Sequence, residues 1–234
     1  MPHAQSISPS GGIVSSIPYR NRSTSGYSRG NFPSAQSGTV NGTSCQILNN
    51  DDGSNSYTID KMYIRFTLPT IPDDAIIDKF TIQLSVENDG VAENADDADF
   101  LKTAFAYCSN ITVDGSENDQ DTWNDIDWNK LTDGYASFNL IDGTDVLWTC
   151  SKGGLLERIR YHYDNSLNKI AFWHVDKHQV EENPPTGANT MMWFTSALGT
   201  LSQNVPALRV YYHMPADVSF NKGNVDINKG NIVI

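Results

Sequence analysis

Cysteine is scarce in this sequence, and its spacing argues against the usual cysteine-based sites. The three cysteines, Cys45, Cys108 and Cys150, are far apart in a chain of 234 residues and odd in number. Such a set is not typical of a disulfide framework, and without a CxxC pair it does not indicate a zinc site. We expect reduced, partly buried thiols, which suit a protein assembled in a cytoplasm.

Long apolar segments are also missing. The N-terminus lacks the apolar core of a signal peptide. No apolar run approaches the roughly 20 residues that a membrane helix needs. We therefore expect a soluble protein with no visible Sec signal and no membrane partner.

Acidic residues are absent from the first part of the chain. No Asp or Glu precedes Asp51, whereas Arg20, Arg22 and Arg29 lie in that stretch. The net charge is −12, so the part from Asp51 onward carries all 28 acidic residues against 13 of the 16 basic ones. A surface this acidic does not suit a phosphate backbone, which needs basic groups for neutralisation. We expect no nucleic-acid partner.

Catalytic motifs are not apparent either. The sequence has no G-x-S-x-G and no phosphate loop, and its acidic loops single out no carboxylate pair for glycoside hydrolysis. Cys108 and Cys150 lie in apolar strand-like patterns, which favour inert packing over reactivity. We expect a protein that is not an enzyme and has no cofactor.

The clearest positive signal is an alternation of apolar and other side chains. In residues 63–68 every second side chain is apolar, and Phe80, Ile82, Leu84 and Val86 share one face of the next run. A Pro-Asp-Asp turn separates the two runs. A period of two is the signature of a half-buried strand, so we predict two core strands of an antiparallel sandwich.

The remaining pattern predicts further strands and a single helix. Leu155, Leu156, Ile159 and Tyr163 recur at helical spacing, which predicts a helix over 153–163. Further strands are predicted at 45–48, 100–109, 135–141, 146–150, 169–175, 191–196 and 207–213, and a long polar loop at 113–134. Short strands with turn signals and one helix favour an all-β, jelly-roll-like antiparallel sandwich over residues 45–214.

Residues 1–44 are predicted to form an extended arm. Their Ser, Gly, Asn and Pro content cannot bury a core. Such an arm becomes ordered when it lies on a neighbouring subunit, which we favour, or along its own domain. The candidate assembly contacts in this arm are Tyr19, Arg20, Arg22, Tyr27, Arg29 and Phe32.

Residues 215–234 form a short repeat. Two Asn-Lys-Gly-Asn turns separate three apolar triplets of β character, at 218–220, 225–227 and 232–234. Because a seven-residue period is too short to bury its own apolar face, the repeat should pair with another chain or fold back as a small meander. The candidate contacts here are Phe220, Val225, Ile227 and Ile232.

Metal sites are weakly indicated. His174 and His178 would suit zinc on a helix, but on the predicted strand they would lie about 13 Å apart, too far for one metal. The Asp clusters at 96–99 and 119–127 could offer oxygen ligands to Ca²⁺, although neither has EF-hand spacing. Solvated acidic loops are the favoured interpretation, and calcium stays open.

Four tryptophans could serve a sugar-binding surface or the core. Trp148 and Trp173 lie in strand patterns and are predicted to be core residues. Trp123 and Trp128 lie in the predicted polar loop and could stack on a sugar. We favour packing for both, with glycan binding as the alternative.

The order of these features resembles that of DNRLRE-type domains, which are β-sandwiches similar to carbohydrate-binding modules. The run YIRFTLP at 63–69 resembles their "LLRFDLSSLP" opening, and DTWN at 121–124 resembles their "vTWNN" loop. LWT at 147–149 before the helix resembles their "DVT…LVQ…W" segment with a displaced Asp, and 194–212 resembles their "F.S.E…P.L.V.Y" ending. The resemblance covers roughly 55–214. It implies a jelly-roll sandwich and a surface, adhesion or binding role.

Together these features favour a virion structural protein without enzymatic activity, most specifically a capsid decoration protein of a tailed phage. Assembly in a host cytoplasm reconciles the missing export signal with a domain type expected outside cells. The expected partners are capsid or tail proteins and copies of the chain itself, and a trimer would suit an icosahedral shell. A carbohydrate-binding module or adhesin is the alternative, and a polysaccharide-degrading enzyme is a weaker third hypothesis.

Overall fold

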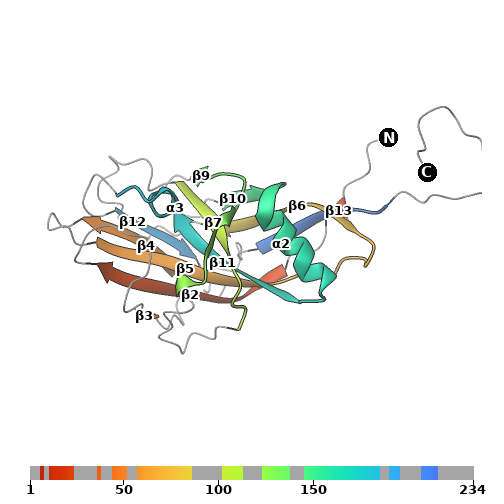
Figure 1. Ribbon diagram of the computed structural model, residues 1–234, viewed down its shortest axis with the longest axis horizontal. Helices are drawn as coiled ribbons and strands as arrows, with labels where there is room; N and C mark the ends of the chain where they lie inside the picture. Colours follow the sequence, from red (N-terminus) through yellow and green to blue (C-terminus); the bar gives the residue numbers. More distant parts are fainter. Residues whose placement is uncertain are drawn as a thin grey trace, which may run out of the picture.

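The computed structural model describes the backbone of most predicted elements. The described residues are 6–7, 11–23, 36–37, 44–51, 57–85, 102–112, 123–137, 145–184, 190–195 and 207–215. The side chains described are those of 61–84, 102–112, 123–136, 146–184 and 207–215. The described part is an antiparallel all-β sandwich with few helices, which confirms the predicted fold class (Figure 1). No described helix has the length and apolar character needed to cross a membrane.

Two sheets face each other across the core. Sheet A contains β10 (Asp145–Cys150), β6 (Ile76–Ser85), β13 (Ala207–His213) and β1 (Ser6–Ile7). Sheet B contains β2 (Gly11–Ser23), β5 (Tyr57–Thr67), β11 (Lys169–Asp176), β7 (Lys102–Cys108), β8 (Asp127–Leu131), β4 (Ser44–Asp51), β12 (Thr190–Thr195), β3 (Gln36–Ser37) and β9 (Ala136–Ser137). The first residues of β2 pair with β13 and the rest with β5, so β2 passes from one sheet to the other.

The predicted strand pair is confirmed, and its two members lie in opposite sheets. Ile64 and Phe66 of β5 and Phe80 and Ile82 of β6 are all 0 % exposed and belong to one apolar cluster. The turn between the strands is closed by the Ala75 amide, which donates to the Pro72 carbonyl at 3.1 Å. Because β5 pairs within sheet B and β6 within sheet A, this connection carries the chain across the core.

Strand β2 corrects the prediction for part of the N-terminal arm. Residues from Ile13 to Ser23 pair with the chain's own β5, from Phe66 back to Tyr57. For residues 11–23 the structure therefore supports the interpretation of a tail along its own domain, and the sandwich begins before residue 45. A local sequence pattern does not show which strand a segment will pair with. Here β2 pairs along the edge of the long strand β5.

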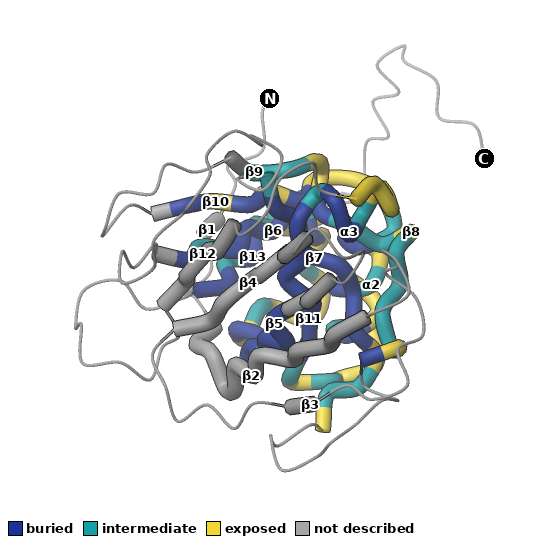
Figure 2. The backbone as a smooth tube through the Cα atoms, turned by 90° about the vertical axis from the view of Figure 1, so that its left-hand side faces the viewer, coloured by how far each residue is buried: buried dark blue, intermediate teal, exposed yellow. Residues whose placement is uncertain are grey.

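The helix α2 (Gly153–Asp164) closes one side of the core. Leu155, Leu156 and Ile159 join the apolar cluster shared by both sheets, which confirms the predicted helix and its apolar face. The helix begins at Gly153, whose φ of +73° is readily adopted only by glycine. Buried residues concentrate in the central strands beside α2 (Figure 2).

Besides β1, β2 and β3 in the predicted arm, two elements were not predicted. Strand β8 lies inside the predicted polar loop, and the short helix α3 (Lys177–Glu181) follows β11 directly. The Asp176 carboxylate caps α3 by accepting from the Gln179 amide at 2.8 Å. The other predicted strands are confirmed as β4, β7, β10, β11, β12 and β13; β9 confirms the start of 135–141, whose remainder from 138 lies outside the described residues.

Candidate functional site

A second apolar cluster covers the outer face of sheet B. Tyr63, Trp123 and Trp173 are at most 1 % exposed, and Trp173 makes edge contacts with the other two rings at 5.7 and 6.3 Å between centroids. Tyr63 neighbours Ile64 on β5, so the two residues face opposite sides of the sheet. This cluster therefore fixes the segment around Trp123 against the sheet.

Lys61 is buried inside this aromatic cluster. Its Nζ donates to the Trp123 carbonyl and lies 4.2 and 4.3 Å from the ring centroids of Trp123 and Trp173. The side chain is 2 % exposed, and burial lowers the pKa of Lys61 from 10.5 to about 7, with the charge of Asp125 opposing the shift. The aromatic faces attract the ammonium and offset part of its lost hydration.

Hydrogen bonds hold Asp125 and the segment around it in place. The Asp125 carboxylate accepts from the Ser109 hydroxyl at 2.8 and 2.9 Å and from the Asn110 amide at 2.5 Å. The Asp125 carbonyl accepts from Trp173 Nε1 at 2.9 Å, and the Tyr63 hydroxyl donates to the Asn110 carbonyl at 2.8 Å. These bonds tie the start of β8 to the end of β7 and to the sheet.

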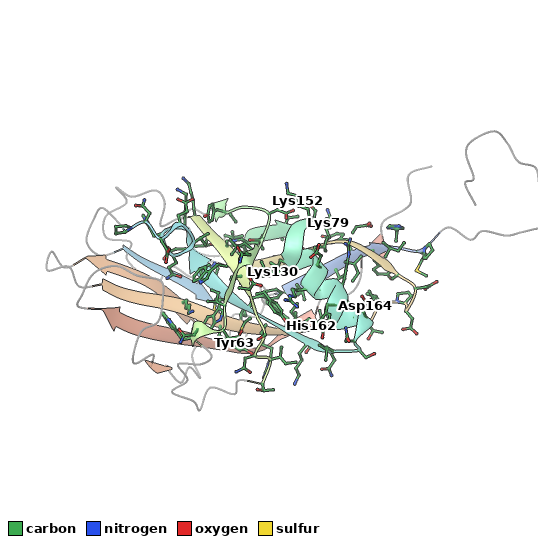
Figure 3. The ribbon with its side chains drawn as sticks, in the orientation of Figure 1. Tyr63, Lys79, Lys130, Lys152, His162 and Asp164 are labelled. Atoms are coloured by element: carbon green, nitrogen blue, oxygen red, sulfur yellow. The ribbon has the colours of Figure 1, made fainter. Side chains whose placement is uncertain are left out.

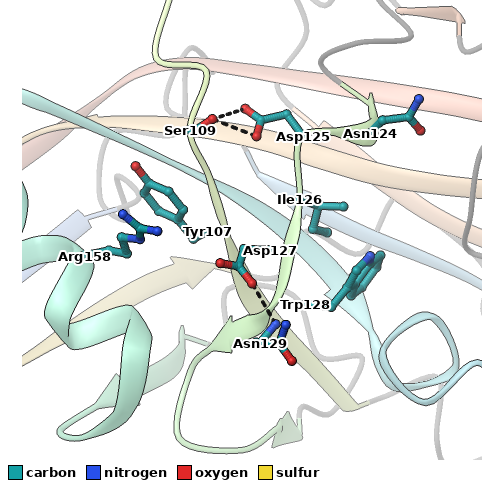
Figure 4. Close-up of a pocket in the computed structure, with 9 residues that line it drawn as sticks. All are labelled: Tyr107, Ser109, Asn124, Asp125, Ile126, Asp127, Trp128, Asn129 and Arg158. Carbon is teal, nitrogen blue, oxygen red and sulfur yellow. Dashed lines mark hydrogen bonds between the residues drawn. The ribbon is translucent and has the colours of Figure 1, made fainter.

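A pocket of about 470 Å³ opens beside this anchored segment, between β7, β8 and α2 (Figure 4). Its walls are Tyr107, Ser109, Asn124, Asp125, Ile126, Asp127, Trp128, Asn129 and Arg158. The volume lies within the range of roughly 300–1,000 Å³ that is usual for small-molecule sites. The lining combines aromatic surface with carboxylates, amides and a guanidinium.

Helix α2 supplies the positive charge of the pocket. The Arg158 guanidinium lies 5.1 Å from the ring centroid of Tyr107. The Tyr107 hydroxyl bonds His162 Nε2 at 3.1 Å, and His162 Nδ1 bonds the Lys169 carbonyl at 2.6 Å. Since a carbonyl only accepts, we assign the His162 proton to Nδ1, and Tyr107 then donates to Nε2. Burial lowers the pKa of His162, which favours this neutral form. Figure 3 labels His162 on helix α2.

The structure separates the two loop tryptophans proposed for glycan contacts. Trp123 is 1 % exposed, so it has no free ring face for a sugar, and this part of the glycan alternative is corrected. Trp128 is partly buried and lines the pocket. Trp148 and Trp173 are confirmed as core residues.

Of the other pocket side chains, the sequence indicated only Asp125 and Asp127, as part of the Asp cluster at 119–127 considered for calcium. Tyr107, Asp127 and Arg158 come from three elements that only the fold brings together. The alternation of Asp127 and Asn129 with Trp128 was a usable strand signal. It was hidden by the many polar residues of the predicted loop.

The assembly contacts lie mostly beyond the described residues. Tyr19, Arg20 and Arg22 belong to β2, of which only the backbone is described. Outside the described residues are Tyr27, Arg29, Phe32, Phe220, Val225, Ile227 and Ile232.

The two histidines considered for a metal lie in different elements. His174 is 0 % exposed on β11, stacked on Phe105 at 4.7 Å, and burial lowers its pKa to about 3. His178 lies on α3 and not on a strand, because the chain turns into a helix at the Asp176 cap; its Nδ1 bonds the Asn183 carbonyl at 2.8 Å.

The structure describes only part of the acidic clusters that were considered for calcium. Residues 96–99 and 119–122 lie outside the described residues, and Asp125 already accepts three hydrogen bonds from Ser109 and Asn110. The described side chains contain no group of three or more potential metal ligands. Calcium binding therefore stays an untested prediction.

The two described thiols are free and buried. Burial raises the pKa of Cys150 to about 12 and that of Cys108 well above its usual value. Both side chains are 0 % exposed, as expected for packing residues.

Comparison with known proteins finds no family model that matches the chain and no similar curated protein. The resemblance to DNRLRE-type domains thus stays a prediction from the motifs.

Proposed function

We propose that this protein is a structural protein of a virion surface without enzymatic activity, most specifically a capsid decoration protein of a tailed phage. The observation that carries the proposal is the sequence repeat at 215–234, whose three-residue segments, predicted as β, are too short to bury one another. Such segments gain stability by adding strands to the edge of another sheet. The expected partners are capsid or tail subunits and other copies of this chain.

The edge of sheet A at β10 supports this proposal. Strand β10 pairs with β6 along its whole length, and no described strand pairs with its other edge. The Thr149 carbonyl at the end of that edge accepts from the Asp133 amide at 3.0 Å. Leu147 is 50 % exposed in the middle of β10. An edge of this kind can accept a strand from another subunit.

A size measurement tests the assembly role. We expect the full chain to form a defined oligomer in light scattering after gel filtration, and a chain that ends at residue 214 to dissociate. Leu147→Lys should weaken the assembly if β10 is the acceptor, whereas Glu157→Lys on the exposed face of α2 should leave it unchanged. A full chain that is monomeric at every concentration contradicts self-assembly.

The virion role needs a separate test. Particles purified from the source of this chain should contain the protein in a fixed ratio to the major shell protein, as measured by mass spectrometry. Labelled antibodies should decorate intact particles. A protein confined to the soluble fraction of infected cells would overturn the proposal.

Carbohydrate binding is the second candidate function, and the pocket beside Trp128 favours it. Sugar sites combine an aromatic side chain with polar groups that bond hydroxyls, and Trp128 lies here with Asp127, Asn129 and Arg158. A glycan array with the full chain tests it. Saturable binding that Trp128→Ala weakens and Glu157→Gln preserves would support a binding module or adhesin.

A further inference from the structure

The carboxylates of Asp125 and Asp127, which both line the pocket, differ in the number of hydrogen bonds that they already accept. Both oxygens of Asp125 accept hydrogen bonds from Ser109, and one also accepts from the Asn110 amide, so Asp125 holds the fold. Asp127 accepts only from the Asn129 amide, at 3.0 Å through Oδ1. Within the described part of the chain its Oδ2 is available to a ligand.

The guanidinium of the pocket is also available. Arg158 lines the pocket and makes a ring contact with Tyr107; its Nε is buried without a hydrogen-bond partner, so a ligand would meet the terminal guanidinium nitrogens, which bond no described residue. Tyr107 cannot turn away easily, because its hydroxyl is held by His162. In Figure 4 the Asp127 carboxylate lies on the side of β8 that faces Arg158, whereas the Trp128 ring lies on the other side, so a strong acceptor and a strong donor share one side of the pocket.

The opposite charges of Asp127 and Arg158 restrict the ligand. A ligand carboxylate would pair with Arg158 but would bring a second negative charge toward Asp127, and a ligand ammonium would have the converse problem. Like charges brought together in a partly desolvated site are costly. A pair of neighbouring hydroxyls meets both groups, because one hydroxyl can donate to Asp127 while the other accepts from Arg158.

We propose that the pocket binds a neutral sugar residue through two neighbouring hydroxyls, one bonded to Asp127 and the other to Arg158. The net charge of −12 acts in the same direction, since it repels acidic polysaccharides at long range. This inference rests on the second candidate function and specifies the class of sugar and the residues that select it.

Calorimetric titration of the full chain tests the selectivity. The probes are a neutral oligosaccharide found on the array, the same oligosaccharide with a uronic acid in place of the terminal sugar, and the same with an amino sugar there. We expect the neutral form to bind at least tenfold more tightly than both charged forms. Tighter binding of either charged form would overturn the inference while leaving a glycan-binding function intact.

Near-isosteric variants test the two residues. Asp127→Asn keeps the shape but loses the charged acceptor, and Arg158→Gln removes the guanidinium; each should weaken binding at least tenfold. Glu157→Gln, on the same helix but exposed and outside the pocket, should bind as the unmodified chain does. Both pocket variants should keep the melting temperature within a few degrees, because neither side chain is a core residue.

The outcomes distinguish a failure of the glycan-binding function from a failure of the assigned binding site. If no neutral, acidic or amino sugar binds, the glycan function itself fails. If sugar binds and neither Asp127→Asn nor Arg158→Gln weakens it, the function stands and the assigned site is wrong.

Discussion

Replacing Lys61 by Met should change how the stability of this protein depends on pH. Lys61 is 2 % exposed, and its Nζ lies between the rings of Trp123 and Trp173. Methionine has a similar length and no charge, and its thioether makes favourable contacts with aromatic rings. The substitution therefore removes the titrating group while keeping the space filled.

The magnitude follows from the shifted pKa. Burial lowers the pKa of Lys61 from 10.5 to about 7, so between these values the unfolded chain binds a proton that the folded chain does not. The free energy of unfolding then rises with pH across this window, and below pH 7 the full cost of burying the ammonium is present. The lowered pKa corresponds to about 5 kcal/mol of stability that is absent below pH 7.

Urea unfolding at pH 6.5, 8, 9 and 10, followed by tryptophan fluorescence, measures this contribution. We expect the stability of the original chain to rise relative to Lys61→Met by about 4 kcal/mol from the lowest to the highest pH. Groups that titrate in this range without interacting with Lys61 are shared by both proteins and cancel in the difference; Cys108 is the exception, because the charge of Lys61 lowers its pKa. A difference that stays constant within about 0.5 kcal/mol would refute the reasoning.

Lys79→Met is the matched control. Lys79 Nζ also lies near an aromatic ring, 4.5 Å from the centroid of Tyr211, but Lys79 is only partly buried. A pH-dependent difference as large as that of Lys61→Met would show that burial is not the cause.

Three further predictions concern the core and the helix. Because burial lowers the pKa of His174 to about 3, stability is lost as pH falls below 6.5; His174→Phe should reduce that loss by about 3 kcal/mol between pH 6.5 and 4 in urea unfolding. Gly153→Ala should cost about 1 kcal/mol, seen as a lower melting temperature, because φ is +73° although no atom lies within 4 Å of an added Cβ. Ile159→Ala should cost about 3 kcal/mol through the cavity it leaves, whereas Glu157→Ala on the exposed face should cost little.

The sequence determined those elements whose signal lies in neighbouring residues. The alternation in β5 and β6 and the helical spacing of Leu155, Leu156 and Ile159 correspond to the buried faces of the structure. Burial of one face imposes a period on the local sequence, so the pattern is visible without the fold. The composition of residues 1–44 likewise indicated a segment without a core of its own, but not that residues 11–23 would pair with β5.

Only the tertiary structure decided which distant residues meet. Lys61 and Trp123 lie 62 positions apart, and Arg158 reaches the pocket because α2 packs against the core beside β8. The polar residues of β8 were predicted to form a loop, and only the pairing of β7 with β8 makes them a strand. For Trp123 the sequence favoured packing and left sugar binding as the alternative, and only its burial against sheet B decides between them. Strand pairing and the packing of one face on another depend on contacts across the whole chain, which no local period records.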